Sequence, residues 1–375
     1  MERQIPLFTL AGVPGARITS IPFSTADKLG LTLTRFTREG DRAPGDAVLV
    51  IHGLTTSMDM FIMPEHYNLV RYLLDHGFRD VWCLDCRMSN RLPYNLQAHR
   101  YTMDDVALYD HPAALAEMKR HIGDRSVHVI THCLGALSFT MSLFGKAVSG
   151  IRSVVANSVA LIPRVPLWSR VKLVVAPFLV ERVLSQPYMS PSWNDNPRYT
   201  VGAILAKLTS VLHPECHVPA CHMLSAMWGT GWPALYSHAN LAPETHQRSR
   251  DLYGATGLHY HRHVRKMVFA GRAVKYDPRN SALSALPDDY LAHASDIKTP
   301  MLLTTGANNH VFTDSNVVCF KALEEVAPGR HRLRVIPGYG HQDVFMGKSV
   351  DQDVFPEIVK FMASHADGVP SIRTG

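Results

Sequence analysis

A cysteine stands at a sharp turn between a predicted strand and a predicted helix. The sequence S-V-H-V-I-T-H-C-L-G places a β-branched run directly before Cys133, with Gly135 two positions later. This is the G-x-S-x-G pattern of a nucleophile elbow, with Thr131 in place of the first glycine and Cys133 in place of the serine. A helix N-terminus and an adjacent imidazole favour a thiolate. The pattern therefore predicts a readily ionised nucleophile, and a buried cysteine that only fills the strand end is the structural alternative.

A second motif supplies groups that could bind a developing negative charge. An earlier apolar strand, A-V-L-V-I, ends in His52, Gly53 and Leu54. The backbone N–H groups of Leu54 and Leu134, the residue after the cysteine, could together form an oxyanion hole for acyl transfer. We expect His52, Gly53 and His132 to border the substrate.

The candidate base is His341, which follows the last predicted strand in the sequence R-L-R-V-I-P-G-Y-G-H. The order nucleophile, acid, histidine is the one that this type of elbow requires. Position 309, where a carboxylate is expected, holds Asn309. An amide can orient an imidazole, as it does beside the cysteine of papain-like proteases. Asp314 is the alternative acid, although its position favours capping the next helix, and we expect Asp343 to order the loop of His341.

These stretches resemble the α/β-hydrolase-like domains found alone or fused to cholesterol-oxidase-type flavoproteins. The similarity covers about residues 25–365 and includes H-G-L-T-T-S, V-W-C-L-D-C-R-M-S-N-R-L-P, V-H-V-I-T-H-C-L-G-A-L-S-F and G-Y-G-H-Q-D-V-F-M-G-K. The resemblance implies Cys133 as nucleophile, His341 as base and Asn309 as the usual family residue. A second resemblance, to polyhydroxyalkanoate synthases, is limited to the cysteine elbow, because those enzymes keep a glycine where this chain has Thr131.

Strands and helices alternate as in an α/β fold with a mostly parallel sheet and helices on both faces. We expect strands at 17–23, 31–36, 47–51, 80–84, 153–157, 301–305 and 332–336, together with the strand that ends at the elbow. Helices are expected at about 62–76, 103–121, 133–145, 314–326 and 352–364. Residues 1–159 and 296–375 would form the hydrolase core, and residues 160–295 an inserted helical cap.

Length and composition fit an enzyme with a large insertion. The chain has 375 residues, of which 46% are hydrophobic and 19% charged, and a formal net charge of +6. No basic run interleaved with aromatic residues suggests nucleic acid, and no apolar stretch is long enough to cross a membrane. The closest, residues 171–184, reads as an amphipathic cap helix that could border a substrate or a membrane surface, or simply pack in the cap. Without a signal peptide, we expect a cytoplasmic location.

Six cysteines without a secretory signal suggest reduced thiols. Cys83 and Cys86 form a C-x-x-C, but Cys83 lies within a predicted strand, which disfavours a redox role. Cys216 and Cys221 could ligate a metal together with His213, His217 and His222. A second closely spaced pair, typical of structural zinc, is missing nearby. We therefore expect neither a metal nor another cofactor.

The predicted function is hydrolysis of an ester or thioester through Cys133, His341 and Asn309. An apolar acyl substrate is expected from seven residues of the cap region, namely Trp168, Phe178, Trp193, Met227, Trp228, Trp232 and Tyr236. The alternatives are an acyltransferase or polyester synthase, and a catalytically inactive binding protein on the same scaffold. The sequence leaves the acyl length, the leaving group and the oligomeric state open.

Overall fold

The computed structural model describes residues 7–39, 45–96, 100–186, 188–230 and 233–366. Its central feature is an eight-stranded sheet in the order β1-β2-β4-β3-β5-β6-β9-β10. Strands β1 and β2 are antiparallel to their neighbours, and the other pairs are parallel. The strands are β1 (Arg17–Ser24), β2 (Gly30–Thr37), β3 (Ala47–Ile51), β4 (Asp80–Asp85), β5 (Val127–His132), β6 (Ile151–Asn157), β9 (Met301–Gly306) and β10 (Arg332–Ile336).

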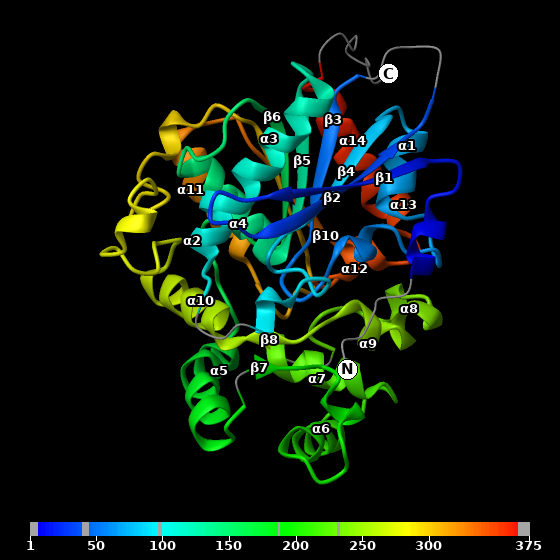
Figure 1. Cartoon of the computed structure of the whole chain (residues 1–375), viewed down its shortest axis with the longest axis vertical. Helices are drawn as coiled ribbons and strands as arrows, with labels where there is room; N and C mark the ends of the chain where they lie inside the picture. Colours follow the sequence, from blue (N-terminus) through cyan, green and yellow to red (C-terminus); the bar gives the residue numbers. More distant parts are fainter. Residues whose placement is uncertain (1–6, 40–44, 97–99, 187, 231–232, 367–375) are drawn as a thin grey trace.

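The central strands are apolar on both faces because helices cover both sides of the sheet (Figure 1). Helix α1 packs against β4 and α14, α3 against β1 and α4, and α11 against β9 and β10. The helices of this layer are α1 (Leu69–Asp75), α3 (His111–Ile122), α4 (Cys133–Phe144), α11 (Ser315–Val326), α12 (Asp343–Met346), α13 (Val350–Asp353) and α14 (Phe355–Ala363). The predicted α/β fold with a mostly parallel sheet is confirmed.

Three predicted helices are shorter or interrupted. The helix expected at 62–76 begins only at α1, where the Asn68 side chain accepts the backbone N–H of Arg71 as an N-cap. The helix expected at 103–121 consists of α2 (Met103–Asp105), a π-helical segment (Val106–Asp110) and α3. That segment ends two residues before Pro112, which has no N–H for a regular helical bond. The helix expected at 352–364 is divided into α13 and α14, and Pro356 lies in the first turn of α14.

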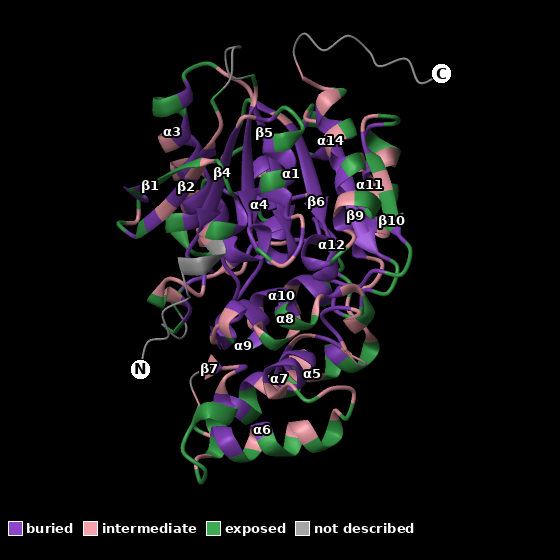
Figure 2. Ribbon diagram, turned by 90° about the vertical axis from the view of Figure 1, so that its right-hand side faces the viewer, coloured by how far each residue is buried: buried purple, intermediate pink, exposed green. Residues whose placement is uncertain are grey.

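Between β6 and β9 the chain forms mostly helices, which lie together at one end of the sheet (Figure 2). They are α5 (Leu167–Phe178), α6 (Val201–Leu212), α7 (Pro219–Trp228), α8 (Pro243–Gln247), α9 (Ser249–Leu252) and α10 (Leu258–Ala270), with the two-residue strands β7 (Tyr188–Met189) and β8 (Thr256–Gly257). Trp193, Met223 and Met227 belong to a small separate core in this segment. The domain boundaries after residues 159 and 295 stay a prediction.

The amphipathic segment expected at 171–184 is α5 followed by a π-helical turn, Leu179–Val183. Its outer face is strongly apolar, with Leu167 78% and Phe178 65% exposed. Among the described residues, none of the helices combines the length and the apolarity needed to span a bilayer.

Candidate active site

The elbow brings β5 directly into α4, and Cys133 is the first residue of the helix. Its φ of 54° is in the left-handed region, which L-residues seldom adopt and which recurs at functional sites. A Cβ on Gly135 would lie 2.0 Å from the carbonyl oxygen of His52, and one on Gly53 would lie 2.7 Å from the Cβ of Cys133. Both glycines are therefore needed for the close approach of the loop after β3 to the start of α4.

Thr131, which replaces the first glycine of the pattern, fits because its side chain lies within the sheet. It is fully buried, and its hydroxyl donates to the carbonyl of Val155 on the neighbouring strand β6 at 3.0 Å. The departure from the usual glycine therefore leaves the turn geometry intact.

The backbone N–H groups of Leu54 and Leu134 both lie within hydrogen-bonding reach of the Cys133 sulfur, so the two candidate oxyanion donors meet beside the candidate nucleophile. Their role as an oxyanion hole stays a prediction. Hydrogen bonds from these two groups lower the pKa of the thiol, but burial has the larger effect and raises the pKa to about 12. The expectation of a readily ionised thiolate is therefore wrong. Desolvation of the enclosed sulfur outweighs the field of the helix N-terminus.

His341 lies beside the elbow, and His132, Cys133 and His341 each offer a potential ligand atom within 4.8 Å of the others. The ring centroids of His132 and His341 are 4.9 Å apart. The Phe312 ring also lies beside His341, with 6.0 Å between the ring centroids. Burial, together with His132, lowers the pKa of His341 well below its usual range. The site thus pairs a neutral thiol with a neutral imidazole, and the same three side chains could bind a soft metal ion.

The loop that carries His341 is held by its backbone. The N–H groups of His341 and Gln342 both donate to the carbonyl of Leu235, at 3.1 and 2.7 Å. Asp343 accepts from the backbone of Gly340 and from the Asn240 side chain, so it orders this loop as expected. Both ring nitrogens of His341 are buried and have no hydrogen-bond partner among the described residues.

The structure does not bring Asn309 into hydrogen-bond contact with the His341 ring. The Asn309 amide donates to the Thr305 hydroxyl at 3.2 Å, and its carbonyl accepts the backbone N–H groups of Val311 and Phe312 at 3.0 Å each. Asp314 is half-exposed and faces Arg164 at 3.3 Å. The asparagine turns toward its own loop because that loop carries two N–H groups that need an acceptor.

The three residues expected to border the substrate lie behind the elbow. His52 is buried, with Nδ1 2.6 Å from the Gly53 carbonyl and Nε2 3.6 Å from the Cys86 sulfur. His132 Nδ1 is 2.8 Å from Asn157 Oδ1 at the end of β6. Gly53 acts through the space it leaves beside Cys133. None of these three residues is among those that line the apolar pocket described below, and their contact with substrate stays a prediction.

Residues 46–347 match the family model described as the alpha/beta hydrolase fold. The chain belongs to the α/β hydrolase family. It is 26% identical over 369 residues to triacylglycerol lipase 1 of Arabidopsis thaliana, covering 92% of this chain and 86% of that protein.

Solved esterase structures share the fold of this hydrolase. A thermostable carboxyl esterase from Bacillus coagulans has 12% sequence identity and a TM-score of 0.58, covering 93% of this chain and 98% of that one. A thermophilic esterase from Thermogutta terrifontis has 13% identity and a TM-score of 0.53, covering 92% and 99%. These structures share the fold alone. The family and the lipase relative support an ester hydrolase as the enzyme class.

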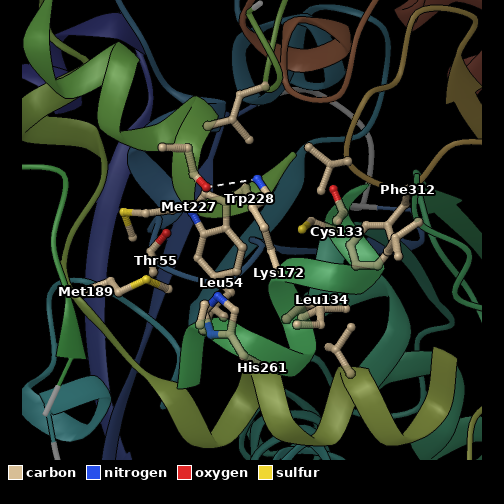
Figure 3. A pocket seen from close by; sticks show the side chains of 18 of the residues that line it. Leu54, Thr55, Cys133, Leu134, Lys172, Met189, Met227, Trp228, His261 and Phe312 are labelled. Atoms are coloured by element: carbon tan, nitrogen blue, oxygen red, sulfur yellow. Dashed lines mark hydrogen bonds between the residues drawn. The ribbon is translucent and has the colours of Figure 1, made fainter. Parts of the chain in front are cut away.

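The hydrolase has an apolar pocket beside the elbow, and Cys133 (Figure 3) and His341 are among the residues that line it. One face of α5 lines it, and α7 and α10 supply the opposite walls; the cap residues include Leu173, Ala176, Pro177, Met227, Trp228, His261 and Val264. Of the residues expected to form such a pocket, Met227 and Trp228 do so.

The other residues expected in the pocket have different surroundings. Trp168 is 62% exposed and Phe178 points to solvent as well. Trp193 belongs to the small core of the cap, and Trp232 lies outside the described residues. The buried Tyr236 places its hydroxyl 2.9 Å from the Ser249 hydroxyl. The type of these residues suggested an apolar cap, but not which of its faces they would occupy.

Sequence reasoning missed Lys172, the cation in the pocket lining (Figure 3). Its Nζ donates to the carbonyls of Ala226, at 2.9 Å, and Gly229 at the C-terminal end of α7. Burial lowers the pKa of Lys172 to about 8. A cation at this end of a helix is favourable, so Lys172 joins α5 to α7 across the pocket. Its position within an apolar helical pattern gave no sign of this contact.

Proposed function

We propose that the protein hydrolyses carboxylic esters or thioesters with apolar acyl groups, with Cys133 as nucleophile and His341 as general base. The observation that carries this proposal is the meeting of three features at one end of an apolar pocket. These are the thiol of Cys133, the paired N–H groups of Leu54 and Leu134, and the imidazole of His341. An acyl chain in the pocket would place its carbonyl carbon at the sulfur.

The chemistry begins from the neutral pair. His341 removes the thiol proton as the Cys133 sulfur attacks the carbonyl carbon, and the N–H groups of Leu54 and Leu134 bind the resulting oxyanion. The C–O or C–S bond of the substrate then breaks, and the imidazolium returns its proton to the leaving alcohol or thiol. Water, deprotonated by His341, hydrolyses the acyl-cysteine thioester and restores both groups.

The pH profile provides a first prediction. Because the pKa of His341 lies well below 6.5, the base remains unprotonated as the pH falls from 7 through 6.5. We expect kcat/KM for a p-nitrophenyl ester to stay level across this interval. An exposed histidine base would instead lose activity as it gains a proton near pH 6.5. A fall of kcat/KM with a midpoint near 6.5 would contradict a buried, neutral His341.

We keep Asn309 in the site as a positioning residue. Its carbonyl holds the backbone of Phe312, and the Phe312 ring lies beside His341. Asn309→Ala is expected to lower kcat about 10- to 100-fold, through loss of imidazole orientation. Asn309→Asp should retain most activity because a carboxylate accepts the same two N–H groups. Steady-state kinetics of both variants, together with circular dichroism to confirm that they are folded, test the role of Asn309. Equal activity of Asn309→Ala and the parent would remove Asn309 from the site.

Acyl length tests the proposed substrate class. Each methylene buried in the pocket contributes about 0.8 kcal/mol, so we expect kcat/KM for p-nitrophenyl octanoate to exceed that for the acetate by at least about 10-fold. The same pair of chain lengths should be compared as acyl-CoA thioesters. Equal values of kcat/KM for octanoyl and acetyl substrates would contradict an acyl-binding pocket.

The same assays would distinguish two other functions from hydrolysis. An inactive binding protein is favoured by one observation, that within the described structure the His341 ring has no hydrogen-bond partner and hence no carboxylate partner. An acyltransferase would release octanoate slowly in water and faster when an alcohol or thiol acceptor is added. The closer resemblance to domains of cholesterol-oxidase-type flavoproteins and the cytoplasmic location stay predictions.

A further inference from the structure

Four metal-ligating side chains from separate segments of the chain meet outside the active-site pocket. Cys216 lies in the loop after α6, Cys221 on α7, His238 at the start of the 3₁₀ helix His238–Asn240, and His246 on α8. Each offers a sulfur or a ring nitrogen, and the four atoms all lie within 4.8 Å of one another. The Cys221 sulfur is 3.4 Å from Nε2 of His238.

This arrangement matches the demands of a tetrahedral zinc site. Zn–S bonds of about 2.3 Å and Zn–N bonds of about 2.0 Å place the ligand atoms about 3.3–3.8 Å apart in a tetrahedron. The four side chains are therefore already close to the required separation. Two thiolates and two imidazoles form a donor set typical of structural zinc, and thiolates select against hard ions such as magnesium and calcium. We propose that Cys216, Cys221, His238 and His246 bind one Zn²⁺ ion per chain.

The surroundings of the four side chains favour a bound cation. The carboxylate of Glu215, next to Cys216 and close enough to interact with Cys221, has two buried oxygens with no hydrogen-bond partner among the described residues. A buried carboxylate is unfavourable unless a positive charge lies near. His222 lies outside the set of four, but its Nε2 is 2.9 Å from the Cys216 carbonyl and 3.3 Å from the Cys216 sulfur. Such contacts hold ligand loops in place.

The proposed ion would hold the base of the active site in position. His238 is flanked by Leu235, whose carbonyl accepts the backbone N–H groups of His341 and Gln342, and by Asn240, whose amide donates to Asp343 at 2.7 Å. None of the four proposed ligands lines the pocket. The ion would therefore be structural, and it would join the loop after α6, α7 and α8 to the segment that fixes the His341 loop.

The sequence around Cys216 and Cys221 holds only one closely spaced pair of cysteines, which is why no metal was predicted there. The nearby candidate partners, His213, His217 and His222, are replaced in the structure by two histidines from later segments. Structural zinc sites are usually recognised in a sequence by two closely spaced pairs of ligands. This site does not show that spacing, because the fold of the segment between α7 and α8 brings His238 and His246 together.

The test uses the full chain, purified under reducing conditions, stripped with a chelator and then titrated with Zn²⁺ or Co²⁺. We expect one tightly bound ion per chain by mass spectrometry of the desalted protein. With Co²⁺ we expect the intense visible absorption of a tetrahedral site and a thiolate-to-cobalt charge-transfer band. Cys216→Ser and His246→Ala should each weaken binding at least 10-fold, whereas His217→Ala, an exposed neighbour of Cys216, should bind as the parent does.

A second control separates this site from the active site, where His132, Cys133 and His341 also approach one another. Cys133→Ala should keep the full metal content and the cobalt spectrum. The proposal is overturned if the parent chain retains no ion, if the ion is lost in Cys133→Ala but kept in Cys216→Ser, or if Cys216 and Cys221 react equally fast with iodoacetamide before and after zinc is added. The spectrum and the alkylation of the parent chain decide the question even where a variant fails to fold.

Discussion

Cys133→Ala is expected to lower kcat/KM for p-nitrophenyl octanoate by at least about 10³-fold while the chain stays folded. Removal of a nucleophile from an enzyme that uses a nucleophile and base as a unit typically costs about 10⁴–10⁶ in kcat. Alanine keeps the Cβ of Cys133 and removes only the sulfur, which borders the pocket. Thermal unfolding should therefore change little. Activity above a tenth of the parent would remove Cys133 from the mechanism.

Cys319→Ala is the matched control, since Cys319 is also a fully buried thiol, on α11 and outside the pocket lining. Burial raises the pKa of Cys319 to about 12, as it does for Cys133, and of the two only Cys133 lines the pocket. We expect Cys319→Ala to keep the parent activity. Cys133→Ser should be much less active than the parent, because a serine needs a stronger base than an imidazole without a carboxylate partner.

Gly135→Ala is expected to destabilise the fold by about 1–3 kcal/mol and to lower kcat/KM sharply. Helix propensity alone predicts the reverse, because alanine in a helix is more stable than glycine by about 1 kcal/mol. Here the added Cβ would lie 2.0 Å from the His52 carbonyl oxygen and 3.2 Å from Ile51 Cγ2. The start of α4 must then move away from the loop after β3, and the N–H groups of Leu54 and Leu134 separate.

Gly45→Ala is the control for this substitution, since a Cβ at Gly45 meets nothing within 4 Å and its backbone is not in the left-handed region. Its free energy of unfolding should stay within about 0.5 kcal/mol of the parent. Chemical denaturation gives the free energy of unfolding of both variants, and kcat/KM is measured in parallel. A Gly135→Ala chain as stable and active as the parent would show that the elbow does not need the close approach seen in the structure.

The sequence predicted the parts of the site that directly follow strands. Cys133, Leu54 and His341 each stand in a turn next to an apolar run, and parallel strands end at the same edge of a sheet. Strand order and turn position were therefore enough to bring these residues together. The fold class could be predicted because the central strands are buried segments separated by helices.

Other properties depend on side-chain direction and burial, which no local pattern contains. The raised pKa of Cys133 follows from burial of the thiol in the folded chain. The Asn309 side chain turns to the backbone of its own loop, and His52 turns toward Cys86 behind the elbow. Lys172 reaches the end of α7 across a pocket that only the packed cap creates. Tertiary contacts decided the outcomes for Cys133, His52 and Lys172, whereas hydrogen bonds within its own loop decided the outcome for Asn309.

Trapping of the acyl-enzyme tests the central proposal most directly. The full chain is mixed with p-nitrophenyl octanoate, quenched in acid during turnover, and analysed by mass spectrometry of the intact protein and its peptides. We expect one octanoyl group per chain, attached as a thioester to Cys133 and released by hydroxylamine. Turnover without acylation of Cys133, or an octanoyl group on another residue such as Ser138, would contradict a cysteine nucleophile at the elbow.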